Sequence, residues 1–306
     1  MIVLRNIASS TDMRRLAYPI LILSFVCFVS SCKKTEDVSK PEIQILCESG
    51  YICENAILGP GEDVELKFSY SANGAPVTCF SQRLFSESST TVVDSGIYAE
   101  NGTFIVRISK SLVLLEKWEF FVRDRNGNNS DTIKIELHLD TAAQFGQITR
   151  IGSATLGAQT STTAGSFFGI SSATVYDAQQ AFQNQTQINL VYYYDFITSD
   201  ANTIASPGAN IDTSVFSGQY NLPNWTTLNT TRFVQTSVAE NDFLSATHDS
   251  IILANGFVFA SGKRKAKNLT AGDVYAFDNE VNTGLFLVRQ VSGTGDGSIT
   301  IELIYR

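Results

Sequence analysis

Hydrophobic and polar residues alternate with a period of two over much of residues 41–140. One segment has an apolar residue at every second position: Val64, Leu66, Phe68 and Tyr70. This spacing places the four side chains on one face of a strand. The same alternation recurs in residues 103–109, 117–123 and 132–139, and Asp-Arg-Asn-Gly-Asn-Asn at 124–129 is typical of a hairpin turn. The pattern predicts a β-sandwich over residues 41–140.

The remainder of the chain, residues 141–306, is also rich in β-forming residues. Residues 187–194 form one continuous run that is long enough for a central strand. Three further strands are predicted at 273–277, 284–291 and 298–305, with a glycine-rich turn before the last. Two short helices are predicted, at residues 175–182 and 240–248. The expected fold class is therefore all-β: an immunoglobulin-like β-sandwich followed by a second β-sandwich or barrel-like domain with one or two short helices.

Two resemblances accompany this prediction. The closing hairpin, residues 120–139, resembles the last strand pair of bacterial immunoglobulin-like domains, which commonly act as stalks. Most of residues 148–306 resembles a C-terminal region of uncharacterised Bacteroidetes lipoproteins, in the stretches 165–168, 188–193, 204–207 and 272–277 and in the pair Gly284-Leu285. The second resemblance implies a location and an architecture and brings no known chemistry.

The N-terminus predicts export. Arg14-Arg15 precedes a 13-residue apolar run at 16–28, followed by small residues, which is typical of a secretory signal. The run is shorter than the roughly 20 apolar residues of a membrane-spanning helix. Val29-Ser30-Ser31-Cys32 resembles the lipobox of bacterial lipoproteins. That resemblance implies that residues 1–31 are a signal peptide and that Cys32 is acylated and becomes the mature N-terminus.

This reading predicts a location and a membrane partner. Residues 32–40 are polar and charged and are expected to form a lipidated tether. The acyl chains on Cys32 would anchor the protein to a membrane. We expect an outer-membrane lipoprotein whose β domains face the periplasm or the cell exterior.

Composition and charge narrow the class of protein. The 306 residues are 43% hydrophobic, 11% aromatic and 17% charged, which is ordinary for a globular protein. Lys and Arg number 22 against 30 Asp and Glu, giving a net charge of −8. Because this balance offers no electrostatic attraction to phosphate backbones, no nucleic-acid partner is expected.

Three cysteines remain after Cys27 leaves with the signal and Cys32 takes lipid. Cys47 and Cys53 flank five residues and are candidates for a disulfide in an oxidising compartment. Pairing of Cys79 with either of them is an alternative. No metal site and no cofactor are predicted, because the two histidines, His138 and His248, lie far along the chain from these thiols.

Aromatic and basic residues are the candidates for ligand binding. Glycan-binding surfaces stack sugars on rigid aromatic rings, which makes Tyr192, Tyr194 and Trp225 candidates; the alternative is that these rings fill the core. Residues 263–267 contain four cations in five positions. Lys263, Arg264 and Lys265 are therefore candidates for an acidic glycan or phosphate, and a solvated loop is the alternative.

Catalytic signatures are absent from the sequence. It contains no Gly-x-Ser-x-Gly, no phosphate-binding loop and no His-Glu-x-x-His. A pair of carboxylates acting on a polysaccharide remains an alternative, with four candidates: Asp195, Asp212, Glu240 and Asp242. The expected function is a noncatalytic binding module for a glycan or a partner protein on an immunoglobulin-like stalk. A polysaccharide hydrolase and a purely structural envelope component are the alternatives.

Overall fold

The computed structural model describes residues 40–86 and 89–306. The predicted signal peptide, Cys32 and almost all of the tether lie outside the described residues. Ser39–Arg306 is a single compact unit. Within the described residues, 18 strands form four open sheets and the helices are short, which confirms the all-β prediction.

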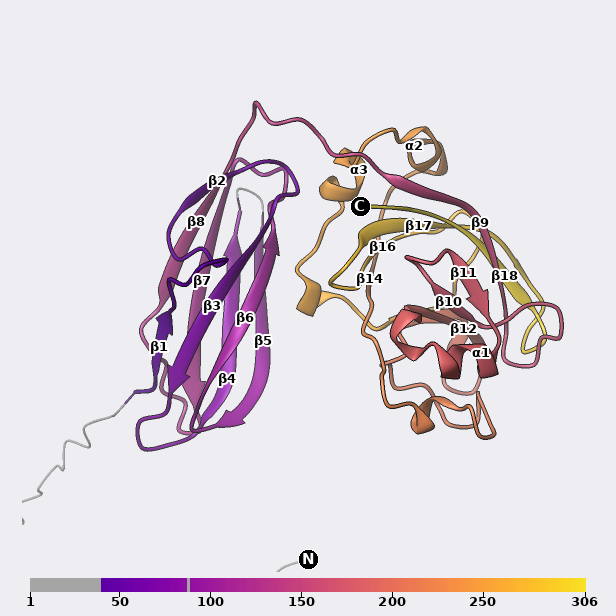
Figure 1. Ribbon diagram of the computed structural model, residues 1–306, viewed down its shortest axis with the longest axis horizontal. Coiled ribbons are helices and arrows are strands. Elements are labelled where there is room, and N and C mark those ends of the chain that lie inside the picture. The colour runs from indigo at the N-terminus through magenta and orange to yellow at the C-terminus, as the bar shows by residue number, and fades with distance from the viewer. Residues whose placement is uncertain (1–39, 87–88) are drawn as a thin grey trace, which may run out of the picture. The chain divides into compact units, whose positions relative to one another are not determined.

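The first two sheets are built by the strands of residues 42–139 (Figure 1). A three-stranded sheet has the order β1-β3-β6, and a five-stranded sheet has the order β2-β8-β7-β4-β5. The bounds are β1 (Glu42–Ile45), β2 (Ala56–Leu58), β3 (Asp63–Ser71), β4 (Val77–Phe85), β5 (Thr90–Ala99), β6 (Asn101–Ser109), β7 (Leu115–Asp124) and β8 (Ile133–Leu139). All pairings are antiparallel except that of β2 with β8.

A single apolar core joins these two sheets. The predicted alternation in β3 is confirmed, because all four of its apolar side chains are buried. They pack against residues of the five-stranded sheet, including Phe80, Trp118 and Phe120. The Phe68 and Phe120 ring centroids are 4.8 Å apart. Contact between the inner faces of two sheets defines a β-sandwich.

The strands of residues 149–305 form the other two sheets, each with five strands. Their orders are β11-β10-β12-β13-β15 and β14-β16-β17-β18-β9. The bounds are β9 (Thr149–Gly157), β10 (Phe167–Gly169), β11 (Thr174–Tyr176), β12 (Leu190–Asp195), β13 (Asp200–Ala205), β14 (Arg232–Gln235), β15 (Lys265–Ala266), β16 (Val274–Asp278), β17 (Thr283–Ser292) and β18 (Ser298–Tyr305). The predicted terminal meander corresponds to β16, β17 and β18.

Both faces of these two sheets are covered, which explains their continuous apolar runs. One core contains Tyr192 of β12 together with Phe277 and Phe286 of the facing sheet. The other face of β12 packs against α1 and the loop that carries Trp225. A strand buried on both faces has no polar side to alternate with, so its sequence reads as continuously hydrophobic.

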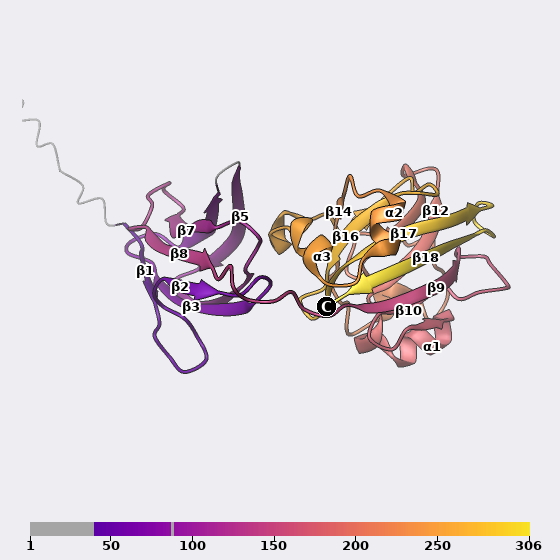
Figure 2. The same cartoon turned by 90° about the horizontal axis from the view of Figure 1, so that it is seen from above.

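Three short helices lie over the outer faces. They are α1 (Ala178–Gln183), α2 (Glu240–Ser245) and α3 (Ser250–Ala254). Asp177 begins α1 with a capping box. Phe243 of α2 and Ile252 of α3 pack on the sheet of β16 and β17 (Figure 2). The first predicted helical segment, 175–182, overlaps α1, but its first two residues belong to β11. The second, 240–248, contains α2, and α3 begins two residues after it.

The chain passes between the two pairs of sheets once. The last strand of the first pair ends at Leu139, and the first strand of the second pair begins at Thr149. The predicted domain division between residues 140 and 141 lies in this connection and stays a prediction. No helix in the part of the chain that the structure describes has the length and hydrophobicity needed to cross a membrane.

Candidate functional site

The aromatic candidates for glycan stacking lie in the core. Tyr192 is fully buried, and Trp225 is only 6% exposed. The indole of Trp225 packs against Phe167 with ring centroids 5.4 Å apart, and its Nε1 donates to the carbonyl of Tyr220 at 3.0 Å. These rings offer no free face to a sugar, so their assignment as ligand-binding residues is corrected: they fill the interior.

Tyr194 is half-buried and also packs against the core. Its backbone is held on both sides by Gln159, whose amide accepts from the Tyr194 N–H at 3.0 Å and donates to its carbonyl at 2.7 Å. Burial raises the pKa of neighbouring Tyr192 to about 12. The structure therefore places the tyrosine run inside a packed layer and assembles no aromatic platform from it.

The basic run at residues 263–267 is largely neutralised by one buried acid. Asp200 is 1% exposed, and its Oδ2 accepts from the Lys265 ammonium at 2.7 Å. Lys267 is ion-paired with the other carboxylate oxygen. Arg264 donates to the carbonyl of Gly208 at 2.8 Å. Of the predicted anion site, Lys263 alone makes no ion pair or side-chain hydrogen bond with a described residue, and the proposed cluster for an acidic glycan is not assembled.

A third donor completes the surroundings of this carboxylate. The Tyr193 hydroxyl donates to Asp200 Oδ2 at 2.6 Å. Burial acts to raise the pKa of Asp200, but the hydrogen bonds from Lys265, Lys267 and Tyr193 outweigh it, and the net pKa lies below the usual range. The same burial and hydrogen bond raise the pKa of Tyr193. The cluster holds β12, β13 and β15 together, so its role is structural.

Of the four carboxylates considered for hydrolysis, three have a partner close by within the described residues. Asp195 accepts from the Thr198 hydroxyl at 2.6 Å, and Asp212 accepts from the Ser214 N–H at 2.9 Å. Glu240 is ion-paired with Arg289. Asp242 is exposed on α2. The structure does not bring these acids together at a cavity.

Cys47 and Cys53 form a disulfide with Cα atoms 5.3 Å apart, and Cys79 is a free thiol. His138 is exposed, and His248 is exposed and stacked on Phe145 with ring centroids 5.0 Å apart. Among the described residues, no three His, Cys, Asp or Glu side chains are grouped so that they could hold a metal ion.

The best candidate site is a cavity of about 440 Å³ at the edge of the first sandwich, hereafter the sandwich-edge cavity. Its walls come from β4, β5, β6 and the start of β7 on one side, and from α3, the segment after α3 and parts of residues 278–306 on the other. The apolar lining includes Phe80, Leu84, Ile97, Phe104, Val106, Ile108, Phe257 and Val258. No local sequence pattern indicated this site, because its walls come from two parts of the chain, residues 80–118 and 252–306, that are more than 130 residues apart.

One polar side chain of β4 breaks the apolar lining. Gln82 is 9% exposed and lies two residues from both Phe80 and Leu84, on the inner face of the strand. Its side-chain amide makes no hydrogen bond with any described residue, and neither of its polar atoms is fully enclosed by protein. The amide therefore offers both a donor and an acceptor to the sandwich-edge cavity.

A buried ion pair forms another part of the wall. Lys110 and Glu116 are 0% and 1% exposed, and their charged atoms are 3.1 Å apart. The ammonium also donates to the carbonyls of Ser111 and Val113, and the carboxylate accepts from Trp118 Nε1 at 3.0 Å. Each of the three ammonium donors thus has an acceptor within the protein.

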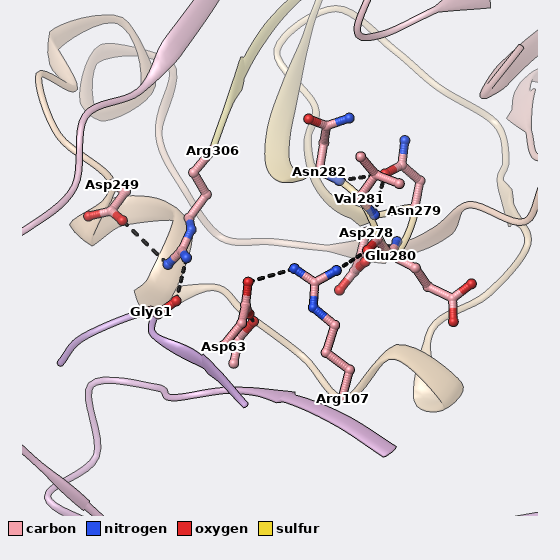
Figure 3. A network of polar contacts seen from close by, with 11 residues as sticks. Gly61, Asp63, Arg107, Asp249, Asp278, Asn279, Glu280, Val281, Asn282 and Arg306 are labelled. Atoms are coloured by element: carbon pink, nitrogen blue, oxygen red, sulfur yellow. Dashed lines mark hydrogen bonds and ion pairs between the residues drawn. The ribbon is translucent and has the colours of Figure 1, made fainter. Parts of the chain in front are cut away.

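Two arginines make further polar contacts beside the cavity (Figure 3). Arg107 of β6 pairs with Asp63 at 2.5 Å and also donates to the carbonyl of Glu280. Arg306 donates to the carbonyl of Gly61 and lies 3.4 Å from a carboxylate oxygen of Asp249. These contacts join β3 and β6 to the segments near the C-terminus that form the far wall.

A further carboxylate in the lining lies close to this network. Asp278, at the end of β16, is half-buried and accepts from the Glu280 N–H at 2.7 Å. Burial raises the pKa of Asp278 above its ordinary value, and the nearby acids Glu280 and Asp63 act in the same direction. That backbone hydrogen bond and the charge of Arg107 oppose the shift without cancelling it.

Comparison with known proteins assigns no family. No family model matches the sequence, and no curated protein matches it. Among solved structures, the chain is similar to a DUF4466 family protein from Parabacteroides merdae, with 9% identity and a TM-score of 0.40. The match covers 87% of this chain and 98% of that one. A TM-score of 0.40 is below the level at which two chains are taken to share a fold.

Replacing the buried acid that holds the basic run should destabilise the protein. Asp200→Asn leaves Lys265 without its counter-ion, so the free energy of unfolding should fall by about 3 kcal/mol at pH 7. Because the folded-state pKa of Asp200 is lowered, its contribution is present above the unfolded pKa of about 4 and is lost as pH falls through the folded value. Urea unfolding between pH 3 and 7 measures the difference. Asp242→Asn is the control and should change stability little; equal stability of Asp200→Asn and wild type at pH 7 would contradict the structural role.

The opposite sign is expected at the cavity. Because the folded-state pKa of Asp278 is raised, its ionisation opposes folding, and stability falls as pH rises from the unfolded pKa of about 4 to the folded value. Asp278→Asn can still accept the Glu280 N–H and removes the charge. The variant should therefore unfold at higher urea than wild type at pH 7 and at nearly the same urea at pH 3.5. A lower midpoint at pH 7, with the exposed control Asp296→Asn unchanged, would show that the charge of Asp278 is needed.

Proposed function

We propose that this protein is a lipid-anchored envelope or cell-surface protein that acts as a noncatalytic binding module, and that the sandwich-edge cavity is its binding site. The observation that carries the proposal is a cavity of about 440 Å³ with mainly apolar walls and an unpaired amide. Small-molecule sites in proteins are concave, mostly apolar and of this size, with a few polar groups that orient the ligand.

Two features support export and anchoring. The lipobox-like sequence that ends at Cys32 follows a basic and apolar leader. The disulfide between Cys47 and Cys53 is of a kind that persists in oxidising compartments and is rare in the cytosol. Two or three acyl chains on one cysteine would hold the protein at a membrane, since each buried CH₂ contributes about 0.8 kcal/mol.

The immunoglobulin-like assignment is part of the proposal. The five-stranded order β2-β8-β7-β4-β5, opposite the three-stranded order β1-β3-β6, supports this assignment. In variable-type immunoglobulin domains, the sheet that contains the last two strands is extended by an additional strand beside the strand named C. In this proposal the sandwich is not only a stalk. It also takes part in ligand binding, because its open edge forms most of the cavity wall.

Filling the cavity should abolish ligand binding. Ile97 lines the cavity, whereas Val92 lies on the same strand with 53% of its surface exposed and is not part of the lining. The hydrocarbon probe diphenylhexatriene should bind one molecule per chain, and Ile97→Trp should weaken its binding at least tenfold by occupying the space. Val92→Trp, the matched control, should bind like wild type. Fluorescence titration measures both, and circular dichroism checks folding.

A second variant distinguishes loss of binding by cavity filling from loss of binding by misfolding of Ile97→Trp. Val106→Phe adds bulk from the facing strand β6 and should give the same loss. Binding that survives both substitutions, or that is absent from wild type, would refute the assignment of the cavity as the binding site.

Substitution of Cys32, the residue that the lipobox resemblance identifies as the lipid attachment site, tests membrane anchoring. Cys32→Ala should abolish incorporation of labelled palmitate and release the protein from sedimented membranes, because no acyl chain can then be attached. Cys27→Ala, five residues earlier in the predicted signal peptide, is the control and should keep both properties. Membrane sedimentation of Cys32→Ala at the wild-type level, together with palmitate incorporation, would contradict lipid anchoring at this residue.

A further inference from the structure

We infer that the sandwich-edge cavity selects an uncharged, mainly apolar small molecule carrying one hydrogen-bonding group, and that this group pairs with the Gln82 amide. The inference rests on the proposed function and names the class of ligand. Three observations carry it: the unpaired amide, the apolar walls and the pairing of every nearby cation.

Among the polar side chains of the described lining that are at least nine-tenths buried, only Gln82 makes neither a hydrogen bond nor an ion pair within the protein. Gln82 has 91% of its surface buried, and no described residue accepts from or donates to its side chain. The polar groups of Lys110, Glu116 and Trp118 in the same wall are engaged with one another and with nearby backbone. A hydroxyl, carbonyl or amine of a ligand would satisfy the amide, because Gln can donate and accept.

The walls fix the remainder of the ligand as apolar. The inner faces of β4, β5 and β6 contribute Phe80, Leu84, Ile97, Phe104 and Val106, and the facing segment contributes Phe257 and Val258. A hydrocarbon or aromatic skeleton transferred from water to these walls is stabilised in proportion to its buried area. A sugar would bring more hydroxyls than the single free amide can pair, so a glycan is disfavoured.

The charges at the cavity disfavour an anion. Each lining cation has an acid partner: Lys110 pairs with Glu116, Arg107 with Asp63, and Arg306 with Asp249. Two further acids, Asp278 and Glu280, line the cavity and form no ion pair with a described residue. A carboxylate or phosphate would therefore lose its water next to surplus acids without gaining a free cation.

Two dyes with the same skeleton test the charge selection. N-phenyl-1-naphthylamine is uncharged and has one N–H, and 1-anilinonaphthalene-8-sulfonate adds an anionic sulfonate to it. The protein used is residues 33–306, which keep the whole compact unit Ser39–Arg306. We expect the uncharged dye to bind one molecule per chain at least tenfold more tightly than the sulfonate. Glu280→Gln should raise sulfonate affinity about two- to threefold and leave the uncharged dye unchanged, which separates charge from the hydrophobicity of the dyes.

A substitution at the amide tests the hydrogen bond. Gln82→Leu keeps the side-chain volume nearly constant and removes the polar group, so affinity for the uncharged dye should fall about three- to tenfold, the value of one hydrogen bond. Diphenylhexatriene has no hydrogen-bonding group, and its affinity should stay within about twofold. Gln82→Asn, which keeps an amide on a shorter side chain, should retain more dye affinity than Gln82→Leu.

These experiments distinguish failure of the proposed binding site from failure of the assigned ligand class. If no probe binds the wild-type protein, the cavity is not a binding site and the proposed function and this inference both fail. If the probes bind but the sulfonate equals the uncharged dye, or Gln82→Leu weakens the dye and diphenylhexatriene alike or weakens neither, the ligand class assigned here is wrong and the cavity remains a binding site.

Discussion

The separation of two edge strands is the constraint on which the candidate site depends. β5 and β6 follow each other in the chain, yet β5 pairs with β4 in the five-stranded sheet and β6 pairs with β3 in the three-stranded sheet. No ladder of hydrogen bonds joins them, so the sandwich is open along this edge. Apolar inner faces at an open edge must be covered, and Val258, which packs against the core of this sandwich, is part of the cover. The cavity is the space that this cover leaves unfilled.

The ion pair of Lys110 and Glu116 fits the same constraint. Lys110 follows β6 and Glu116 lies near the start of β7, so the pair ties the three-stranded sheet to the five-stranded sheet beside the cavity. A buried pair of this kind contributes little net stability, because the desolvation of both charges offsets their attraction. Its contribution is geometric: it fixes where one sheet ends relative to the other, and with it the shape of the wall that Trp118 completes.

The strands of the first sandwich could be predicted from the sequence because local pattern and burial agree there. In β3 every second residue faces the core, and the alternation of Val64, Leu66, Phe68 and Tyr70 in the sequence predicts this arrangement. The second pair of sheets could be assigned as strands but not as a layered structure. The continuous run of β12 does not reveal that α1 and the loop of Trp225 cover its outer face, since that coverage depends on contacts between distant segments.

The same limit explains why the sequence did not show that the candidate aromatic rings are buried and that the candidate basic residues are largely paired. Tyr192 and Tyr193 point to opposite faces of a strand, and both faces are buried, so neither ring reaches solvent. Read from the sequence alone, the basic run looks like an anion site because its acidic partner is not nearby in the chain. That partner, Asp200, lies 65 residues before Lys265. Residue type and local spacing identify candidate chemistry, but they do not tell whether a distant residue has already neutralised it.

A local signal for the candidate site was nevertheless present in the sequence. In β4 the residues Phe80, Gln82 and Leu84 share one face, and a glutamine occupies a position where the alternation calls for an apolar side chain. A polar residue in the apolar phase of a strand is disfavoured by burial unless something pairs with it. Within the described chain nothing pairs with this amide, and the space beside it is large enough for a small molecule. A polar residue at an apolar position of a strand therefore indicates a candidate site at least as strongly as a cluster of exposed charges. A buried polar group needs a hydrogen-bond partner, whereas water can solvate an exposed charge.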